Sequence, residues 1–455
     1  KTYNGMGVPI GARAGGELFN LDMQAYETSH GPHGLVAGTT GSGKSELLQS
    51  IIISLAINFH PHDVVFVLID YKGGGMADVF KGMPHLVGTI TNLGGNQTTR
   101  ALVSIKSELK RRQAIFSAHE VNNIDKYQKL YHAGKAKEPL PHLIMIADEF
   151  AELKAEQPDF MKELVSAARV GRSLGVHLIL ATQKPAGVVD DQIWSNSRFK
   201  ICLKVQDETD SRDVIKRPDA AMIKEPGRGY IQVGNDEIFE MFQSTFSGAD
   251  YDPDGQASKK SKGKKKLFKV NLDGRTAQIY PTDQEHVDKS ERDSQLKAMV
   301  EYITAVAKEN QIEALKGPWL PPLAETIYLD EVLDYIKPEE DKQKEVWHNQ
   351  NEELIATIGI EDDPKGQKQE SLALNFTSEG NLIIYGAAGT GKTTLLEGIV
   401  MSLAYRYSPE QFSLYIMDFG GGTLKKYEQM PHCGGVMSIE DEDKINQFML
   451  FIFRM

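Results

Sequence analysis

The feature that most constrains this chain is an internal repeat. Residues 34–45 (GLVAGTTGSGKS) recur as residues 382–393 (LIIYGAAGTGKT), an offset of 348 positions (382 − 34). The same offset relates residues 65–70 (VFVLID) to residues 413–418 (SLYIMD), and glycines follow each segment. Self-similarity at one fixed spacing indicates a repeated structural unit. We therefore expect a duplicated domain.

The composition favours a soluble globular protein and limits which partners are expected. The chain has 455 residues, 40% hydrophobic and 25% charged, enough for more than one core. Its net charge of −12 argues against a surface that coats nucleic acid, but leaves room for a local basic pore. Cys202 and Cys433 are far apart, which favours a reducing cytoplasm over a disulfide framework or a zinc site.

The chain ends predict a fragment, and the hydropathy pattern predicts no membrane helix in it. No apolar run reaches the length of about 18 residues that a membrane helix needs. The sequence starts at Lys1 without an initiator Met or a signal-peptide pattern, and it stops at Met455 inside what should be the second copy. We therefore expect a piece of a longer protein.

In each copy, short apolar segments alternate with amphipathic ones. This alternation predicts an α/β fold, a mostly parallel sheet with helices on both faces. The strands expected in the first copy are residues 34–37, 64–69, 143–147 and 176–181. The helices expected there are residues 45–57, 97–116, 159–169 and 207–215.

Two unusual stretches divide the copies. Residues 258–266 (SKKSKGKKK) predict a solvated loop, with an anionic partner as the alternative, and a β-rich extension is expected near residues 267–280. Residues 317–323 (GPWLPPL) predict an extended linker, because proline breaks helices. We expect a first domain at 1–250, the loop, extension and linker at 251–324, and an incomplete second domain at 325–455.

A phosphate-binding loop is predicted in each copy. Both match the pattern G-x-x-x-x-G-K-[ST] between a strand and a helix, so backbone N–H groups and the helix N-terminus face the phosphates. The lysine reaches the β- and γ-phosphates, and the final hydroxyl ligates magnesium. The nucleotide-binding residues expected in the first copy are Gly38, Thr39, Thr40, Gly41, Ser42, Gly43, Lys44 and Ser45. Those expected in the second are Gly386, Ala387, Ala388, Gly389, Thr390, Gly391, Lys392 and Thr393. The predicted cofactors are ATP and Mg²⁺, with Ser45 and Thr393 as metal ligands.

Residues 142–149 (HLIMIADE) complete the first site. A buried strand delivers two carboxylates at its end, where Asp148 would hold the magnesium and Glu149 would activate the attacking water. The alternative is a strand that ends in two solvated acids. Asp148 follows Lys44 by 104 residues (148 − 44), so the corresponding strand of the second copy would lie beyond Met455. Hydrolysis by the second copy therefore stays open.

Further polar residues are candidates for sensing and for transition-state stabilisation. Gln183, at the end of the strand at 176–181, is predicted to sense the γ-phosphate, with a turn residue as the alternative. Arg169, Arg172 or Arg198 could enter a neighbouring subunit's site, although a surface salt bridge is the commoner role. Residues 71–75 (YKGGG) could line the nucleotide site or a pore, or form a turn.

The motifs resemble a known family. GTTGSGKSE, LIMIADEFAEL at 143–153 and GRSLGVHLILATQKP at 171–185 are similar to the FtsK/SpoIIIE family of RecA-like translocation motors. The resemblance implies tandem RecA-like P-loop ATPase domains. It places Arg172 where DNA-pumping members carry an arginine finger, so the catalytic set implied is Lys44, Asp148, Glu149, Gln183 and Arg172.

The tandem copies and the WLPP linker resemble the type VII secretion branch, the EssC/EccC ATPases. That branch implies ATP hydrolysis coupled to export of small helical WXG-type proteins, a ring oligomer (a hexamer), other membrane components of the system as partners, and a place at the cytoplasmic face of the bacterial membrane through helices upstream. It also suggests that the linker, through Trp319 and Leu320, restrains the first domain, with a plain spacer as the alternative.

Two other functions compete with secretion. A DNA translocase has the same fold, but normally one motor domain per chain, so the tandem repeat and the acidic balance make DNA the less favoured partner. A scaffold that binds nucleotide without hydrolysis is disfavoured in the first copy by Asp148 and Glu149.

Overall fold

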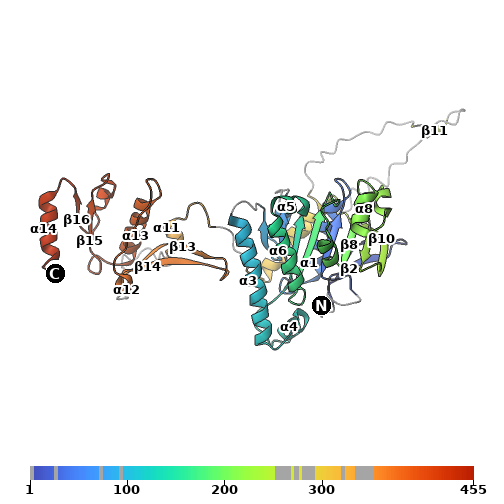
Figure 1. The fold of residues 1–455 in the computed structure, drawn as a ribbon, viewed down its shortest axis with the longest axis horizontal. Helices are drawn as coiled ribbons and strands as arrows, with labels where there is room; N and C mark the ends of the chain where they lie inside the picture. The colour runs from blue at the N-terminus through green and yellow to red at the C-terminus, as the bar shows by residue number, and fades with distance from the viewer. Residues whose placement is uncertain are drawn as a thin grey trace. The chain divides into compact units, whose positions relative to one another are not determined.

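The computed structural model describes residues 5–24, 29–70, 75–91, 96–251, 268–270, 276–278, 293–318, 323–333 and 353–454. The chain divides into two compact units, Lys1–Trp319 (unit 1) and Leu320–Met455 (unit 2), each of which is described by itself (Figure 1). The predicted boundaries at 250 and 324 stay predictions.

Unit 1 is built on a ten-stranded sheet with the order β2-β1-β10-β9-β8-β3-β7-β6-β4-β5. The six strands from β8 to β5 run parallel, and the four from β2 to β9 add antiparallel pairs. The strands are β1 Gly7–Ala12, β2 Leu18–Asp22, β3 His33–Ala37, β4 Val64–Asp70, β5 Leu86–Ile90, β6 His142–Asp148, β7 Val176–Thr182, β8 Phe199–Leu203, β9 Arg228–Val233 and β10 Ile238–Ser244. A separate hairpin pairs β11 Phe268–Val270 with β12 Thr276–Gln278.

Helices cover both faces of this sheet, as the sequence predicts. The central strands are apolar along their whole length because parallel strands are buried on both faces. One core lies between the sheet and α3, α5 and α6, and the other between the sheet and α1. The helices of unit 1 are α1 Lys44–Asn58, α2 Met76–Val79, α3 Asn96–Ala118, α4 Ile124–His132, α5 Phe150–Glu156, α6 Pro158–Gly171, α7 Asp191–Asn196, α8 Glu208–Ile215, the 3₁₀ turn η1 Asp219–Met222 and α10 Gln295–Glu309.

Helix α10 belongs to the core of unit 1 although it lies beyond residue 250. Leu296 and Val300 are buried in the same core as α1, and the N–H of Leu296 donates to the carbonyl of Ser247 at 3.0 Å. The apolar face of α10 therefore packs into the core of unit 1.

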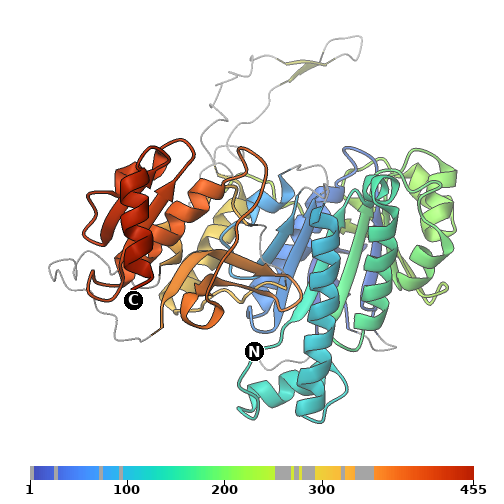
Figure 2. The ribbon, with the colours of Figure 1, turned by 60° about the vertical axis from the view of Figure 1, so that its left-hand side comes forward.

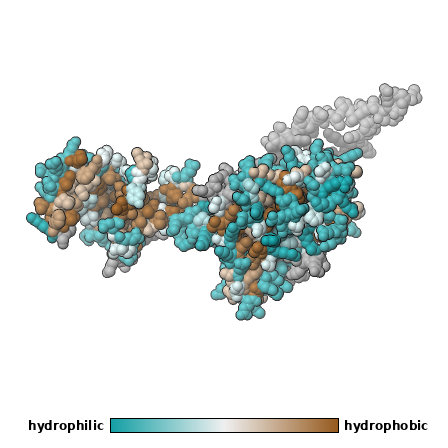
Figure 3. Space-filling view, in the orientation of Figure 1, coloured by the Kyte–Doolittle hydropathy of each residue, from teal (hydrophilic) through white to brown (hydrophobic). Residues whose placement is uncertain are grey.

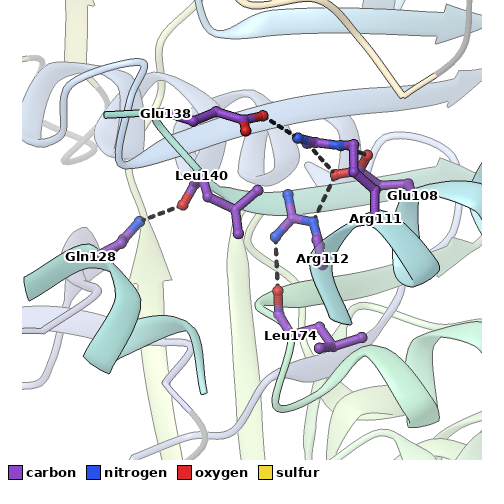
Figure 4. Close-up of polar contacts among 7 residues, drawn as sticks. All are labelled: Glu108, Arg111, Arg112, Gln128, Glu138, Leu140 and Leu174. Carbon is purple, nitrogen blue, oxygen red and sulfur yellow. Dashed lines mark hydrogen bonds and ion pairs between the residues drawn. The ribbon is translucent and has the colours of Figure 1, made fainter. Parts of the chain in front are cut away.

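A buried ion pair fastens α3 to the loop between α6 and β7. The guanidinium of Arg112, 2% exposed, donates to Glu108 and to the carbonyl of Leu174, each at 2.8 Å, as Figure 4 shows. Arg111 joins the same carboxylate to Glu138. Both arginines hold the pKa of Glu108 below its usual value, against the effect of its burial. Figure 2 shows α3 alongside the sheet, with α4 beyond its C-terminal end.

Unit 2 repeats the beginning of unit 1. Helix α13 starts at the P-loop lysine, and β15 pairs in parallel with β16 as β4 pairs with β5. The elements of unit 2 are α11 Leu329–Val332, β13 Ile355–Asp363, β14 Lys368–Asn375, α12 Phe376–Glu379, α13 Lys392–Arg406, β15 Leu414–Asp418, the 3₁₀ turn η3 Thr423–Tyr427, β16 Cys433–Ser438 and α14 Glu442–Ile452. Figure 3 shows brown apolar side chains at the surface of unit 2. By their exposed fractions, Ile383 is 81% and Tyr385 89% exposed.

Some predicted features lie outside the described residues: residues 71–74, the basic run at 258–266, and Trp319 and Leu320 of the linker. In the part of the chain that the structure describes, no helix is both long and apolar enough to span a bilayer.

Candidate nucleotide-binding site

The predicted site residues of the first copy, except Arg172, meet at one edge of the unit 1 sheet. Strands β3, β6 and β7 are neighbours and run parallel, so their C-terminal ends share that edge. The P-loop follows Ala37 at the end of β3, Asp148 ends β6, and Gln183 follows Thr182 at the end of β7. Ligands bind at this edge in open α/β sheets.

Glycine sets the conformation of the P-loop, and strand ends anchor it. Gly41 (φ 77°) and Gly43 (φ 93°) lie in the left-handed region that side chains disfavour. The N–H of Gly38 donates to the carbonyl of Thr182 (3.1 Å), and that of Thr39 to the carbonyl of Lys204 (2.9 Å). A Cβ on Gly43 would lie 2.8 Å from the backbone nitrogen of Gly227, so this contact also requires glycine.

Lys44 forms an ion pair with Asp148. The ammonium donates to Oδ1 of the carboxylate, and the lysine side chain is only 4% exposed. A lysine is rarely buried without a partner, because its charge would lose hydration. The P-loop and the acidic strand end, 104 residues apart in sequence, are thus in direct contact.

Glu149 follows Asp148 in an unusual backbone conformation. Its φ of 55° and ψ of 50° are left-handed, which is rare for a residue with a side chain, and it is 6% exposed. Its carboxylate accepts a hydrogen bond from the hydroxyl of Thr182 at 3.0 Å and from the N–H of Gln183 at 3.2 and 3.3 Å. The turn thus aims the Glu149 side chain at the end of β7.

Gln183 connects this carboxylate to the P-loop. Its side-chain oxygen accepts a hydrogen bond from the hydroxyl of Thr40 at 2.8 Å, while its backbone N–H bonds Glu149. The predicted sensor is therefore in contact with both halves of the site.

A hydroxyl and a carboxylate are available for magnesium. Ser45 is exposed in the first turn of α1, and Asp148 ends β6. Among the described residues, no group of three or more His, Cys, Asp or Glu side chains could hold a metal by itself. Hydroxyl and carboxylate oxygens are ligands that Mg²⁺ takes, with phosphate and water oxygens filling the rest of its shell, so Ser45 and Asp148 fit this ion by their chemistry.

Arg172 does not join this site within the chain. It caps the C-terminus of α6, before β7 begins, and so lies at the opposite edge of the sheet. There it lines a cavity of about 380 Å³ with Arg169 and two buried histidines, His142 and His177. Burial lowers the pKa of His177 to about 3, and that of His142 well below its usual value. The third candidate, Arg198, instead forms a salt bridge with Glu237 at 2.9 Å.

The second P-loop has the same backbone shape and a different lysine partner. Gly389 (φ 76°) and Gly391 (φ 89°) reproduce the glycines of the first loop. The ammonium of Lys392 donates to the carbonyls of Gly386 (2.8 Å) and Ala387 (2.7 Å) of its own loop. Thr393 is exposed on the first turn of α13.

Sequence reasoning missed two residues of the first site. Thr182 is fully buried and contacts Glu149. The sequence feature that could have pointed to it is a hydroxyl residue at the end of β7, after six positions that are apolar or aromatic. Gly227 (φ 75°) donates its N–H to the carbonyl of Ser42 at 2.8 Å. Nothing in the motif pointed to Gly227, because it lies 185 residues further along (227 − 42).

Comparison with known proteins shows the family of the chain. The FtsK/SpoIIIE family model matches residues 6–187 and 339–452. The chain is 49% identical over 447 residues to the type VII secretion system protein EssC of Staphylococcus aureus, covering 98% of this chain and 30% of that protein. It is 48% identical over 460 residues to the ESX secretion system protein EccC of Geobacillus thermodenitrificans, covering 99% and 29%.

A solved structure has a similar fold. The cytoplasmic domain of the type VII secretion ATPase EccC of Thermomonospora curvata matches with a TM-score of 0.77 and 29% identity, over 98% of this chain and 48% of that one. The fold is thus that of tandem P-loop ATPase domains, and this chain spans less than a third of the curated relatives' length. With matching family models over both copies, the chain belongs to the FtsK/SpoIIIE family.

Proposed function

We propose that this chain is part of the ATP-hydrolysing motor of a type VII protein secretion system. The observation that carries the proposal is the contact of Lys44 with Asp148, with Glu149 fixed beside them at the same sheet edge. A phosphate-binding loop next to two strand-end carboxylates is what phosphoryl transfer to water needs. The similarity to EssC and EccC over nearly the whole chain supports the coupling to secretion.

The residues divide the work by their positions. The loop from Gly38 to Ser45 binds the phosphates of ATP, with the Lys44 ammonium on the β- and γ-phosphates. To reach them, Lys44 exchanges part of its contact with Asp148 for the negative phosphate oxygens. Glu149 accepts the proton of the attacking water, and Gln183 senses the γ-phosphate beside Thr40.

Mg²⁺ would be held by the hydroxyl of Ser45 and by the carboxylate of Asp148, which contributes to its coordination shell. When bound, the ion supplies positive charge to the phosphate oxygens. At the second P-loop, Gly386–Thr393 would bind nucleotide in the same manner, with Thr393 as the metal ligand.

Arg172 completes the site from a neighbouring subunit. Because it lies at the edge opposite the P-loop, it can serve only a site on another copy, so the proposal requires a ring, expected to be a hexamer. Further partners are WXG-type secreted proteins and the membrane components of the system. The chain would act at the cytoplasmic face of the bacterial membrane.

Steady-state ATPase activity of this chain, measured over a range of protein concentrations, tests the proposal. Activity should rise with concentration and should fall by about a hundred-fold or more in Glu149→Gln, since loss of a general base costs about 10²–10⁴ in rate. Glu156→Gln, an exposed glutamate on α5, is the matched control and should keep its activity.

Duplex DNA and a WXG-type protein are then added separately. Stimulation by the WXG-type protein, with no response to DNA, supports the secretion motor. Stimulation by DNA alone would move the function to DNA translocation, and unchanged activity in Glu149→Gln would remove the assignment of the first site.

A further inference from the structure

The end of β7 carries a hydroxyl that donates to the proposed general base. Thr182 is fully buried, and its Oγ1 lies 3.0 Å from Oε1 of Glu149. A buried hydroxyl must find partners, because leaving it without one costs free energy. Here one of those partners is the carboxylate whose direction decides whether a water can be deprotonated.

The neighbouring backbone fixes the Thr182 side chain in one orientation. The N–H of Lys184 donates to Oγ1 at 3.1 Å, so one lone pair of the oxygen is occupied. The hydroxyl proton then has two acceptors within reach, Oε1 of Glu149 at 3.0 Å and the carbonyl of Lys184 at 3.3 Å. A charged acceptor at the shorter distance makes the stronger bond, so the proton belongs to Glu149.

The carboxylate has little freedom once these bonds are made. Glu149 is 6% exposed, its backbone is left-handed, and the N–H of Gln183 bonds both of its oxygens. The backbone donor alone would allow the carboxylate to rotate about the N–H direction. The Thr182 hydroxyl removes that rotation by fixing Oε1.

We propose that Thr182 is a positioning residue for Glu149: its hydroxyl sets the direction of the carboxylate that accepts the proton of the attacking water. This inference rests on the proposed ATPase function and adds a residue to which that function assigned no role. Thr182 acts through Glu149 and does not itself touch ATP.

The same contacts connect the direction of Glu149 to the phosphate-binding loop. Gln183 bonds Glu149 through its N–H and Thr40 through its side chain, and the carbonyl of Thr182 accepts the N–H of Gly38 at 3.1 Å. Movement of the P-loop on binding phosphates would therefore be transmitted to the end of β7. Through these bonds, Thr182 and Gln183 together keep the Glu149 carboxylate at a fixed position relative to the phosphates.

The test compares two substitutions that differ by one hydroxyl. Thr182→Val keeps the shape of the side chain and removes the donor, whereas Thr182→Ser keeps the donor. We expect Thr182→Val to lower kcat for ATP by about ten- to a hundred-fold, the effect of losing one hydrogen bond to a charged group, with KM changed less than about two-fold. Thr182→Ser should restore kcat to within about three-fold of the natural chain. Binding of a fluorescent ATP analogue and thermal unfolding are measured on each variant.

A double variant separates positioning from general damage. In a Glu149→Gln background, Thr182→Val should lower the residual kcat no further, because the group it positions is already gone. If Thr182→Val does not fold, Thr182→Ala with the same background gives the same comparison. A kcat unchanged in a folded Thr182→Val or Thr182→Ala, or losses that multiply in the double variant, would overturn the inference.

The outcome also separates this inference from the proposed function. Full activity in Glu149→Gln alone would remove the general base itself, and the inference with it. Loss of activity in Glu149→Gln, with normal kcat in Thr182→Val, would remove only the role of Thr182.

Discussion

The two P-loops of this chain have the same backbone and different surroundings. In the first, Gly41 and Gly43 have φ of 77° and 93°, and in the second Gly389 and Gly391 have φ of 76° and 89°. Both loops lead into a helix of 15 residues that begins at the motif lysine. The eight residues of the motif therefore suffice to set the loop and the start of its helix.

The lysines show what the motif does not set. Lys44 is buried and bonds the carboxylate of Asp148 on β6, a neighbouring part of the sheet. Lys392 bonds the carbonyls of Gly386 and Ala387, both within its own loop. The partner of the lysine is thus supplied by another strand of the sheet, and only the first loop has such a partner in the described part of the chain.

The segment before each loop also depends on the rest of the sheet. In unit 1, residues His33–Ala37 form β3 because β7 and β8 pair with it on either side. The equivalent residues of unit 2, 381–385 (NLIIY), lie outside any strand, and Ile383 is 81% exposed. A strand exists only as part of a sheet, since its backbone groups need partners that the segment itself does not contain.

Replacement of the two lysines should give the largest difference between the copies. Lys44→Ala should lower the ATPase activity of this chain by about a thousand-fold, since a positive donor on the transferred phosphate stabilises charge in the transition state. Lys392→Ala should instead weaken nucleotide binding at the second loop, measured as nucleotide bound per chain, and leave most of the hydrolysis. Equal loss of hydrolysis in both variants would show that the two loops do not differ in the way proposed.

The matched glycines test how much tertiary packing adds to the loop. Gly43→Ala adds a Cβ that meets the backbone of Gly227 and also strains a left-handed residue, whereas Gly391→Ala has nothing within 4 Å of its new Cβ. We expect Gly43→Ala to destabilise unit 1 by about 3 kcal/mol, and Gly391→Ala to destabilise unit 2 by about 1 kcal/mol, the strain alone. Hydrogen exchange in peptides of α1 and α13 measures the two effects, and equal values would mean that the contact with Gly227 adds nothing.

Acid should destabilise unit 1 through its buried histidines. The effect of each histidine is the smallest of those expected here. Burial lowers the pKa of His177 to about 3, and that of His33 and His85 to about 4, against 6.5 when unfolded. Because the unfolded chain binds the protons, their contribution is fully present above about pH 6.5 and falls as the pH drops from there towards 4.

At pH 5.5 each such histidine should remove about 1 kcal/mol of unfolding free energy. Urea unfolding of the natural chain and of His177→Asn at pH 7.5 and 5.5 checks this, because the variant should lose less stability between the two pH values. An identical loss in both chains would contradict a neutral, buried His177. The response of the α13 peptides over the same pH range then shows whether unit 2 shares this sensitivity.

Much of the first site could be predicted because its parts carry local signals. The strand before the first motif, the glycines and the Asp148–Glu149 pair are readable from spacing and polarity, and parallel strands bring their ends to one edge. The segment before the second motif, which the pattern also predicts as a strand, lies outside any strand. The hairpin of β1 and β2, the antiparallel strands β9 and β10 and the packing of α10 carried no comparable signal, since antiparallel additions to a sheet depend on which edge is left to pair.

The sequence by itself determined the duplicated architecture, the shape of both P-loops and the place of the carboxylates at a strand end. These follow from backbone sterics and from apolar patterning, which act over a few residues. Only the tertiary structure decided that Lys44 is buried against Asp148, that Thr182 holds Glu149, and that Arg172 lies at the far edge. Such contacts join residues from separate strands, and their distances are set by how the sheet is ordered and packed.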